Sequence, residues 1–194
     1  MFRKISTLVC TAALVGAAMI TLNAQGTAPP PQAGATASPP SDEHVIANPN
    51  YVALHLEVEV NRSAADVWKR IGGYCAIGEW FQVAAGCKIL AGTDGEVGAV
   101  RSIANEVLVG KTDLSYTYTQ PVRAGRPYNL YHGTLEARPV TATTSKLLYT
   151  LMWDNSMLTD EAAREKDKAS RTATFTRALQ NMKTLAEGGT LTPR

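Results

Sequence analysis

The sequence predicts an α+β domain in which one long C-terminal helix covers a curved antiparallel sheet of about seven strands. Apolar and polar residues alternate at period two in residues 51–60 and again in several segments between residues 87 and 153, which is typical of half-buried strands. From residue 159 to residue 187 the apolar residues recur at three- and four-residue intervals, which indicates an amphipathic helix. Because the inner face of such a sheet has to stay dry, we expect the helix to lie across it.

The domain begins with one strand and two short helices. The strand covers Tyr51 to Val60, and its valines and leucines all fall on one face. Asn61 or Ser63 is a suitable N-cap for the first helix, which we expect to end at the glycine pair 72–73. A second short helical segment is expected at about residues 76–81.

A meander of strands follows. The expected strands are residues 87–90, 97–103, 105–109, 114–119, 128–139 and 145–153, with Thr93-Asp94-Gly95 and Gly110-Lys111 as turns and residues 121–127 as a loop. Tyr116 and Tyr118 share one face of the sheet, as do Tyr149 and Trp153, because each pair is separated by an even number of residues. This alternation does not say which face is the inner one.

The last element is the long helix, from about Thr159 to Glu187, closed by Gly188 and Gly189. Its apolar positions form one stripe, made by Phe175, Ala178, Leu179, Met182, Leu185 and Ala186. Residues 188–194 are expected to form a flexible tail.

The N-terminus has the pattern of a secretory signal. Arg3 and Lys4 precede an uncharged, mostly apolar run from residue 5 to residue 22, and we expect cleavage after Ala24. The prediction is therefore a periplasmic or secreted protein. The alternative is an uncleaved anchor, since such a run can just cross a bilayer, and membrane contact is expected only in that case. Cys10 lies inside the apolar run, which disfavours a lipoprotein signal.

Composition divides the remaining chain and excludes one class of partner. Residues 25–47 are rich in Pro and Ala and are expected to form a disordered linker, which leaves residues 48–187 as one domain. The chain has 19 Lys and Arg against 17 Asp and Glu, so removal of Arg3 and Lys4 leaves 17 of each. A nearly neutral protein without a basic stripe is not expected to bind nucleic acid.

Two cysteines remain after the predicted export, Cys75 and Cys87. An even number of cysteines in an oxidising compartment favours a disulfide, and its loop of about 13 residues corresponds to about 3 kcal/mol in the chain-entropy model. The alternative is two free thiols, one in the short helical segment and one in a strand. No CxxC motif indicates a thioredoxin-type function.

The common catalytic motifs are absent from the sequence. No HExxH, GxSxG, P-loop or GxGxxG is present, so we expect no metal and no cofactor. His132 is the one candidate acid or base, with Tyr131 beside it and Glu136 on the same strand face as its orienting group. The alternative is that His132 and Glu136 belong to a solvent-facing stripe.

Several short segments resemble one family. Ala65-Asp66-Val67-Trp68, residues 73–80 (GYCAIGEW), residues 95–101 (GEVGAVR) and Tyr116-Thr117-Tyr118, in this order of elements, are similar to the START/Bet v 1-like (SRPBCC) superfamily, and within it to bacterial polyketide cyclase/dehydrase-like members. The resemblance implies a helix-grip fold with an elongated apolar cavity between sheet and helix. Related bacterial sequences often have His-Pro after the tryptophan, where this chain has Phe81-Gln82, so a binding role gains weight over catalysis.

Apolar ligand sites combine aromatic walls with a few polar groups. The candidate ligand-binding residues in such a cavity are Trp80, Phe81, Arg101, Tyr116, Tyr118, Tyr131, Tyr149 and Trp153. The first hypothesis is an exported binding or carrier protein for an apolar or aromatic small molecule. The alternative is a cofactor-independent cyclase, dehydratase or lyase that uses tyrosine and histidine side chains within the cavity.

Overall fold

A computed structural model describes residue 46 and residues 48–193 of the chain. The expected signal segment, and the expected linker apart from residue 46, lie outside the described residues. The described elements follow one another in the order β1 (Tyr51–Val60), α1 (Ala64–Ile71), α2 (Ile77–Trp80), β2 (Ile89–Ala91), β3 (Val100–Arg101), β4 (Glu106–Thr112), β5 (Ser115–Thr119), β6 (Asn129–Pro139), β7 (Ser145–Asp154) and α3 (Glu161–Ala186).

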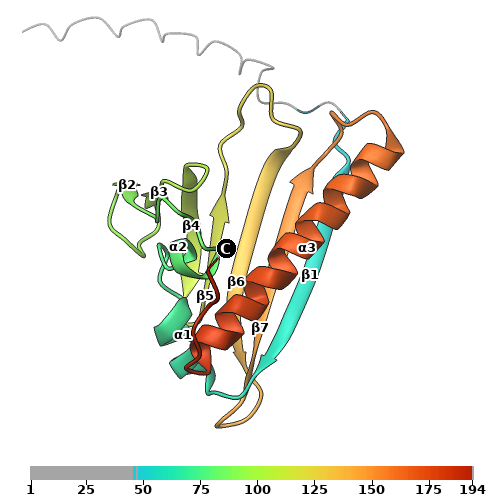
Figure 1. The fold of residues 1–194 in the computed structure, drawn as a ribbon. Coiled ribbons are helices and arrows are strands. Elements are labelled where there is room, and N and C mark those ends of the chain that lie inside the picture. The colour runs from blue at the N-terminus through green and yellow to red at the C-terminus, as the bar shows by residue number, and fades with distance from the viewer. Residues whose placement is uncertain (1–45, 47, 194) are drawn as a thin grey trace, which may run out of the picture. The chain divides into compact units, whose positions relative to one another are not determined.

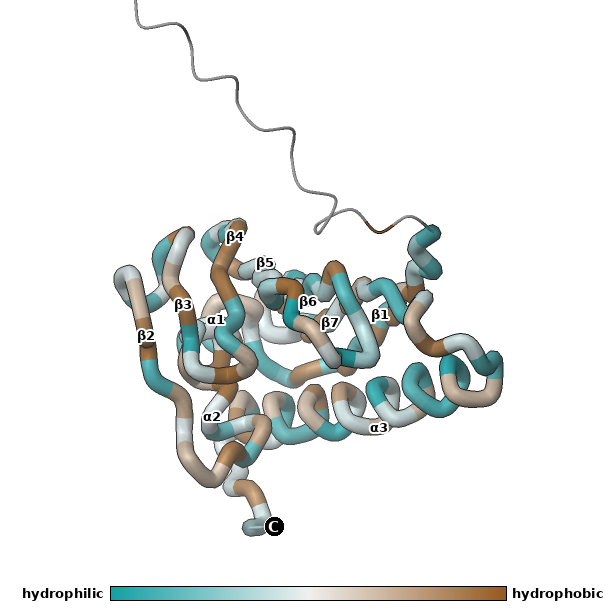
Figure 2. Tube along the Cα trace, turned by 90° about the horizontal axis from the view of Figure 1, so that it is seen from above, coloured by the Kyte–Doolittle hydropathy of each residue, from teal (hydrophilic) through white to brown (hydrophobic). Residues whose placement is uncertain are grey.

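All seven strands form one antiparallel sheet in the order β1-β7-β6-β5-β4-β3-β2. The sheet curves without closing, and α3 lies lengthwise across it, packed mainly against β1 and β7 (Figure 1). Seen from above, α1 and α2 lie on the same side of the sheet as α3, towards β4 and β5 (Figure 2). The predicted class, a helix-grip α+β fold, is confirmed.

The inner face of the sheet is apolar because the alternation in each central strand places every second side chain there. Tyr116 and Tyr118 of β5 are buried, and so are Tyr131 and Leu135 of β6. In β7 the buried side chains on this face are those of Ser145, Leu147, Tyr149, Leu151 and Trp153, and Asp154 at the end of the strand is buried as well. The expected pairing of faces is confirmed, and the structure adds that all these tyrosines point inwards.

Side-chain caps define where the helices begin. Ser63, one of the two expected candidates, is the N-cap of α1, and its Oγ accepts a hydrogen bond from the Asp66 amide at 3.2 Å. Asp160 caps α3 in the same way, accepting from the Ala162 amide at 2.9 Å. The buried residues of α3 all lie in its second half, from Phe175 to Leu185, as the apolar stripe predicted.

Two details of the expected meander are wrong. The turn between β4 and β5 is at Asp113 and Leu114, whereas Gly110 and Lys111 lie within β4, where the register with β5 shifts. Glycine at that position was mistaken for a turn residue, although it also suits a β-bulge. The expected strand at residues 97–103 is reduced to β3, because Gly98 before it adopts a left-handed conformation (φ 93°) and a turn at residues 102–105 follows it.

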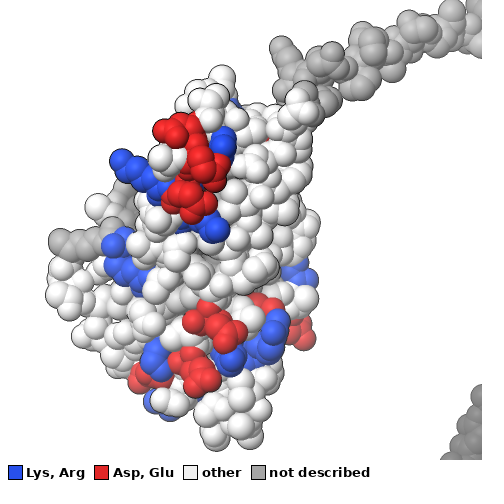
Figure 3. Space-filling view, turned by 90° about the vertical axis from the view of Figure 1, so that its right-hand side faces the viewer, with Lys and Arg blue, Asp and Glu red and all other residues white. Residues whose placement is uncertain are grey.

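The face of the molecule shown in Figure 3 carries both signs of charge in close proximity. Ion pairs on its elements include Arg164 with Glu161 in α3, Lys183 with Glu187, and Lys146 of β7 with Glu57 of β1. Positive and negative groups alternate there, so this face presents no continuous basic surface to a phosphate backbone. Among the described helices, not one combines the length and the apolar character needed to cross a bilayer.

Candidate functional site

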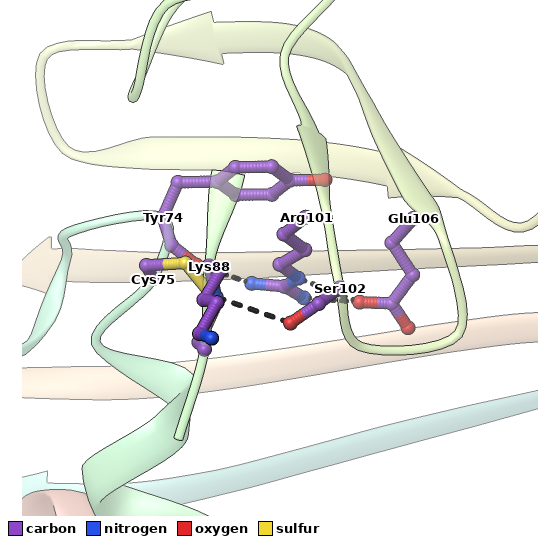
Figure 4. The surroundings of a disulfide bond; sticks show 7 residues. Tyr74, Cys75, Lys88, Arg101, Ser102 and Glu106 are labelled. Carbon is purple, nitrogen blue, oxygen red and sulfur yellow. Dashed lines mark hydrogen bonds and ion pairs between the residues drawn. A yellow bond between two sulfur atoms is a disulfide. The ribbon is translucent and has the colours of Figure 1, made fainter. Parts of the chain in front are cut away.

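A buried ion pair lies on the inner side of β3 and β4. Arg101 and Glu106 are register partners, and the Arg101 guanidinium donates from Nε to the Glu106 Oε2 at 2.7 Å. Neither side chain is more than 4% exposed. Arg101 Nη1 also donates to the Tyr74 carbonyl oxygen at 2.6 Å, so the pair holds the segment after α1 against the sheet (Figure 4).

Aromatic rings surround this arginine. The Arg101 Cζ atom lies 4.3 Å from the ring centroid of Tyr74, 4.7 Å from that of Tyr118 and 5.7 Å from that of Tyr116. A guanidinium at these distances is attracted to the ring faces. The resulting cluster is positively charged at its centre, and Glu106 balances that charge.

Burial favours the neutral form of the inward-facing tyrosines. Burial raises the pKa of Tyr116, Tyr118 and Tyr149 above the usual range, although the positive charge of Arg101 opposes the shift. The hydroxyls of Tyr118 and Tyr149 are 2.9 Å apart and hydrogen bond to each other. At neutral pH these phenols therefore stay protonated.

Glu106 is linked to the surface by a short chain of polar groups. Its Oε1 accepts from Gln120 Nε2 at 2.8 Å, and Gln120 Oε1 accepts from the Tyr128 hydroxyl at 2.7 Å. The pKa of Glu106 is raised overall, because the effect of burial is larger than the opposing effects of the Arg101 charge and of the hydrogen bonds from Arg101 and Gln120. The ion pair is therefore the inner end of a hydrogen-bonded network.

Between the sheet and α3, where the elongated cavity was expected, aromatic side chains pack against one another. The Phe175 ring of α3 lies 4.8 Å from Tyr149 and 5.6 Å from Phe81, measured between centroids. Trp80 is fully buried and packs edge-on against Tyr149 and Phe81. These predicted ligand-binding residues are core contacts in this structure, and their role in binding stays a prediction.

Asp167 and Arg171 of α3, which sequence reasoning missed, close the other end of the interior. Trp153 Nε1 donates to Asp167 Oδ2 at 2.9 Å. The Arg171 guanidinium pairs with Asp167 at 3.1 Å and lies 4.8 Å from the Trp153 ring and 4.4 Å from that of Tyr128. The signal in the sequence that could have found them is their i, i+4 spacing, which is typical of an ion pair on a helix.

A pocket of about 510 Å³ opens at the α1 end of the sheet. Trp68, Tyr74, Leu108 and Tyr116 supply apolar walls, and the rings of Trp68 and Tyr116 are 5.7 Å apart. The remaining lining residues come from glycine-rich turns and from the β4–β5 hairpin: Gly72, Gly73, Gly95, Lys111, Thr112, Asp113 and Ser115.

Of the predicted ligand-binding residues, only Tyr116 lines this pocket. Trp68 and Tyr74 lie in segments that carried the family resemblance, but they were not among the predicted ligand-binding residues. The pocket joins residues from α1, β4 and β5, and such a grouping becomes visible only after folding.

The predicted disulfide between Cys75 and Cys87 is confirmed. It follows Tyr74 directly and ties that segment to the residues before β2. Next to Cys87, Lys88 is hydrogen bonded to Ser102. The Ser102 amide donates to the Lys88 carbonyl oxygen at 2.8 Å, and the Lys88 amide donates to the Ser102 Oγ at 3.0 Å (Figure 4). The disulfide therefore braces one wall of the pocket.

The three catalytic candidates do not come together. Tyr131 is buried on the inner face, whereas His132 and Glu136 lie on the outer face of β6. Glu136 pairs with Arg138 at 2.9 Å and not with His132. Burial lowers the pKa of His132. Within the described residues, no group of three or more His, Cys, Asp or Glu side chains could hold a metal ion.

Comparison with solved structures identifies this architecture. A protein from Thermobifida fusca superposes with a TM-score of 0.59 at 24% identity, over 73% of this chain and 99% of the other. The Zhui aromatase/cyclase from Streptomyces sp. R1128 superposes with a TM-score of 0.55 at 19% identity, over 72% of this chain and 99% of the other. Truncated norcoclaurine synthase from Thalictrum flavum superposes with a TM-score of 0.54 at 12% identity, over 74% of this chain and 98% of the other. No protein-family model and no curated protein sequence matches the chain.

The chain thus has the helix-grip fold of the START/Bet v 1-like (SRPBCC) superfamily, to which its structural neighbours belong. Two of these neighbours are named as an aromatase/cyclase and as a di-domain ARO/CYC protein. At these identities the similarity establishes the fold, and a function has to be argued from the site.

Proposed function

We propose that this protein binds an apolar or aromatic small molecule in the pocket between α1 and the β4–β5 hairpin. The observation that carries the proposal is the pocket itself, about 510 Å³ with Trp68, Tyr74, Leu108 and Tyr116 as its walls. Its volume is within the range of small-molecule sites, and it combines aromatic walls with polar side chains from the β4–β5 hairpin.

The buried cluster behind the pocket supports this role by holding the walls in place. Arg101 is in contact with Tyr74 and Tyr116 and is itself fixed by Glu106. Walls that are held before binding lose little conformational entropy when a ligand enters, which favours affinity. The arrangement supports a preorganised pocket that recognises the shape of its ligand.

An enzymatic role is the alternative, because two of the similar structures are named as an aromatase/cyclase and a norcoclaurine synthase. A proton-transfer reaction needs a base close to the ligand. Tyr131 and His132 lie on opposite faces of β6, so they form no acid–base pair. If the protein only binds, Tyr131→Phe and His132→Ala alter affinity at most. A product whose formation is abolished by either variant would favour the enzyme.

We include export in the proposal. The Cys75–Cys87 disulfide supports it, since such bonds persist mainly in oxidising compartments. The basic and apolar pattern at the N-terminus supports it independently. Mass spectrometry of the protein from the periplasm and the medium would test export by showing whether the chain begins after Ala24.

The binding proposal is tested with N-phenyl-1-naphthylamine, an uncharged probe whose fluorescence rises in apolar sites. We expect saturable binding to the full chain and about tenfold weaker binding to Trp68→Ala, which corresponds to about 1.4 kcal/mol. Tyr51→Ala is the matched control, because Tyr51 is exposed at the start of β1 and does not line the pocket. Absence of saturable binding, or equal binding by Trp68→Ala, would refute the proposal.

A further inference from the structure

The charges at the rim of the pocket are unequal, and this bears on the class of ligand. Lys111 and Asp113 are the charged side chains that line it. Lys111 Nζ donates to Glu96 Oε1 at 2.7 Å and to the Gly95 carbonyl oxygen at 3.0 Å, so its charge is already compensated. The inference that follows rests on the proposed function of this pocket.

Asp113 has no such compensation. It lies at the tip of the β4–β5 turn, exposed to water, and makes no hydrogen bond or ion pair with any residue that the structure describes. The neighbouring hydroxyls of Thr112 and Ser115 are engaged with each other at 2.7 Å. Lys111, Glu96 and Asp113 together leave one negative charge at the mouth of an aromatic pocket.

The pocket walls, like the rim, favour a positively charged ligand. The Trp68 indole offers the strongest cation-attracting face among the side chains that form the walls. The positive charge of Arg101, behind Tyr74 and Tyr116, is neutralised by Glu106 at 2.5 Å. Neither wall nor rim therefore provides a free cation for an anionic ligand.

We propose that the ligand is an aromatic amine, whose planar body packs against Trp68 and whose protonated amino group pairs with Asp113. A carboxylate of the same shape would meet the uncompensated Asp113 charge and is discriminated against. An uncharged alcohol of the same shape should fall between the two.

The test compares 2-naphthylmethylamine, 2-naphthylmethanol and 2-naphthoate in titration calorimetry with the full chain, at neutral pH and low salt. We expect the amine to bind tighter than the alcohol by up to about fivefold, the upper end of the gain from an exposed ion pair, and the carboxylate to bind more weakly than the alcohol. In Asp113→Asn the amine should lose this advantage, while the alcohol binds as before. Added salt should reduce the preference as well.

Asp94→Asn is the matched control, because Asp94 is an exposed carboxylate in a neighbouring loop that does not line the pocket. It should retain the preference for the amine. An amine that binds no tighter than the alcohol, or an advantage that survives Asp113→Asn, would overturn the inference while the binding proposal stands. If none of the three probes binds, the binding proposal fails and the inference fails with it.

Discussion

Arg101 and Glu106 are separated by a four-residue turn and form a fully buried ion pair. They are register partners at the ends of β3 and β4, and the turn between them contains Ala104 and Asn105 in left-handed conformations, with φ of 49° and 55°. Such backbone conformations carry a conformational cost for residues other than glycine, so surrounding interactions must maintain them. The ion pair and the Gln120 hydrogen bond to Glu106 are among those interactions.

Breaking this pair should be strongly destabilising. Glu106→Gln leaves the buried guanidinium without its counter-charge, and we expect a loss of about 3–5 kcal/mol in the free energy of unfolding. Replacing both residues by apolar ones, Arg101→Met with Glu106→Leu, should recover most of that loss. Urea unfolding of the wild type, of Glu106→Gln and of the double variant measures the three free energies of unfolding.

The surface pair Glu136–Arg138 is the comparison for this measurement. Glu136→Gln should cost less than about 1 kcal/mol, because exposed ion pairs contribute little. A loss of similar size in Glu106→Gln and Glu136→Gln would show that the buried pair has no special role.

Reduction of the Cys75–Cys87 bond should lower stability and loosen the pocket together. Opening a loop of about 13 residues corresponds to about 3 kcal/mol in the chain-entropy model. Because Tyr74 lines the pocket and directly precedes Cys75, we also expect N-phenyl-1-naphthylamine to bind more weakly to the reduced protein or to Cys75→Ser/Cys87→Ser. Thermal unfolding and probe titration with and without reductant measure both effects. Unchanged probe affinity after reduction would argue against the bracing role of the disulfide.

Gly72 is required for the position of Trp68. A β-carbon built on Gly72 would lie 2.4 Å from Trp68 Cδ2, whereas one built on Gly73 comes no closer than 3.6 Å to any neighbour. Gly72→Ala should therefore displace the indole from the pocket wall and weaken probe binding, whereas Gly73→Ala should leave the indole in place. Intrinsic tryptophan fluorescence and the probe titration report on the displacement. Equal behaviour of the two variants would contradict this prediction.

Glu187 should stabilise the fold at neutral pH and lose that effect in acid. Hydrogen bonds from the Asn61 amide and from Lys183 lower the pKa of its carboxyl below the ordinary range. Since the folded protein holds this proton less tightly than the unfolded chain, the contribution is present above the ordinary carboxyl pKa and is lost as pH falls through the folded value. Denaturant unfolding of wild type and Glu187→Gln should differ at pH 7 and converge in acid.

Glu165→Gln is the control for this pH effect, because Glu165 is an exposed carboxylate on the same helix. We expect it to follow the wild type throughout. A difference between wild type and Glu187→Gln that persists unchanged into acid would show that the charge of Glu187 is not its cause.

Most elements could be predicted because they depend on local patterns. The strand Tyr51–Val60 and the buried stripe from Phe175 to Leu185 coincide with the structure, since alternation and helical periodicity report directly on burial. The β4–β5 turn could not be placed in this way. Gly110 suits a turn as well as a bulge, and the pairing of β4 with β5 decided between them.

The site was less accessible to sequence reasoning. Aromatic residues were correctly expected on the inner face, but Trp80, Tyr149 and Trp153 are packed as core, and the pocket forms around Trp68 and Tyr74. Whether an inward-facing tyrosine lines a cavity or fills it depends on the helix and loop that pack opposite, and a single strand carries no information about that.

The sequence by itself determined the fold class and the approximate boundaries of the long elements, and it favoured the pairing of Cys75 with Cys87 that the structure shows. Hydrophobic periodicity and the number of cysteines can be read from the sequence without knowing which residues are in contact. Only the tertiary structure decided that Arg101 meets Glu106 inside a ring of tyrosines, that His132 faces outwards, and that Asp113 borders an aromatic pocket. These relationships join residues from different elements, so they depend on how the curved sheet and its covering helices come together.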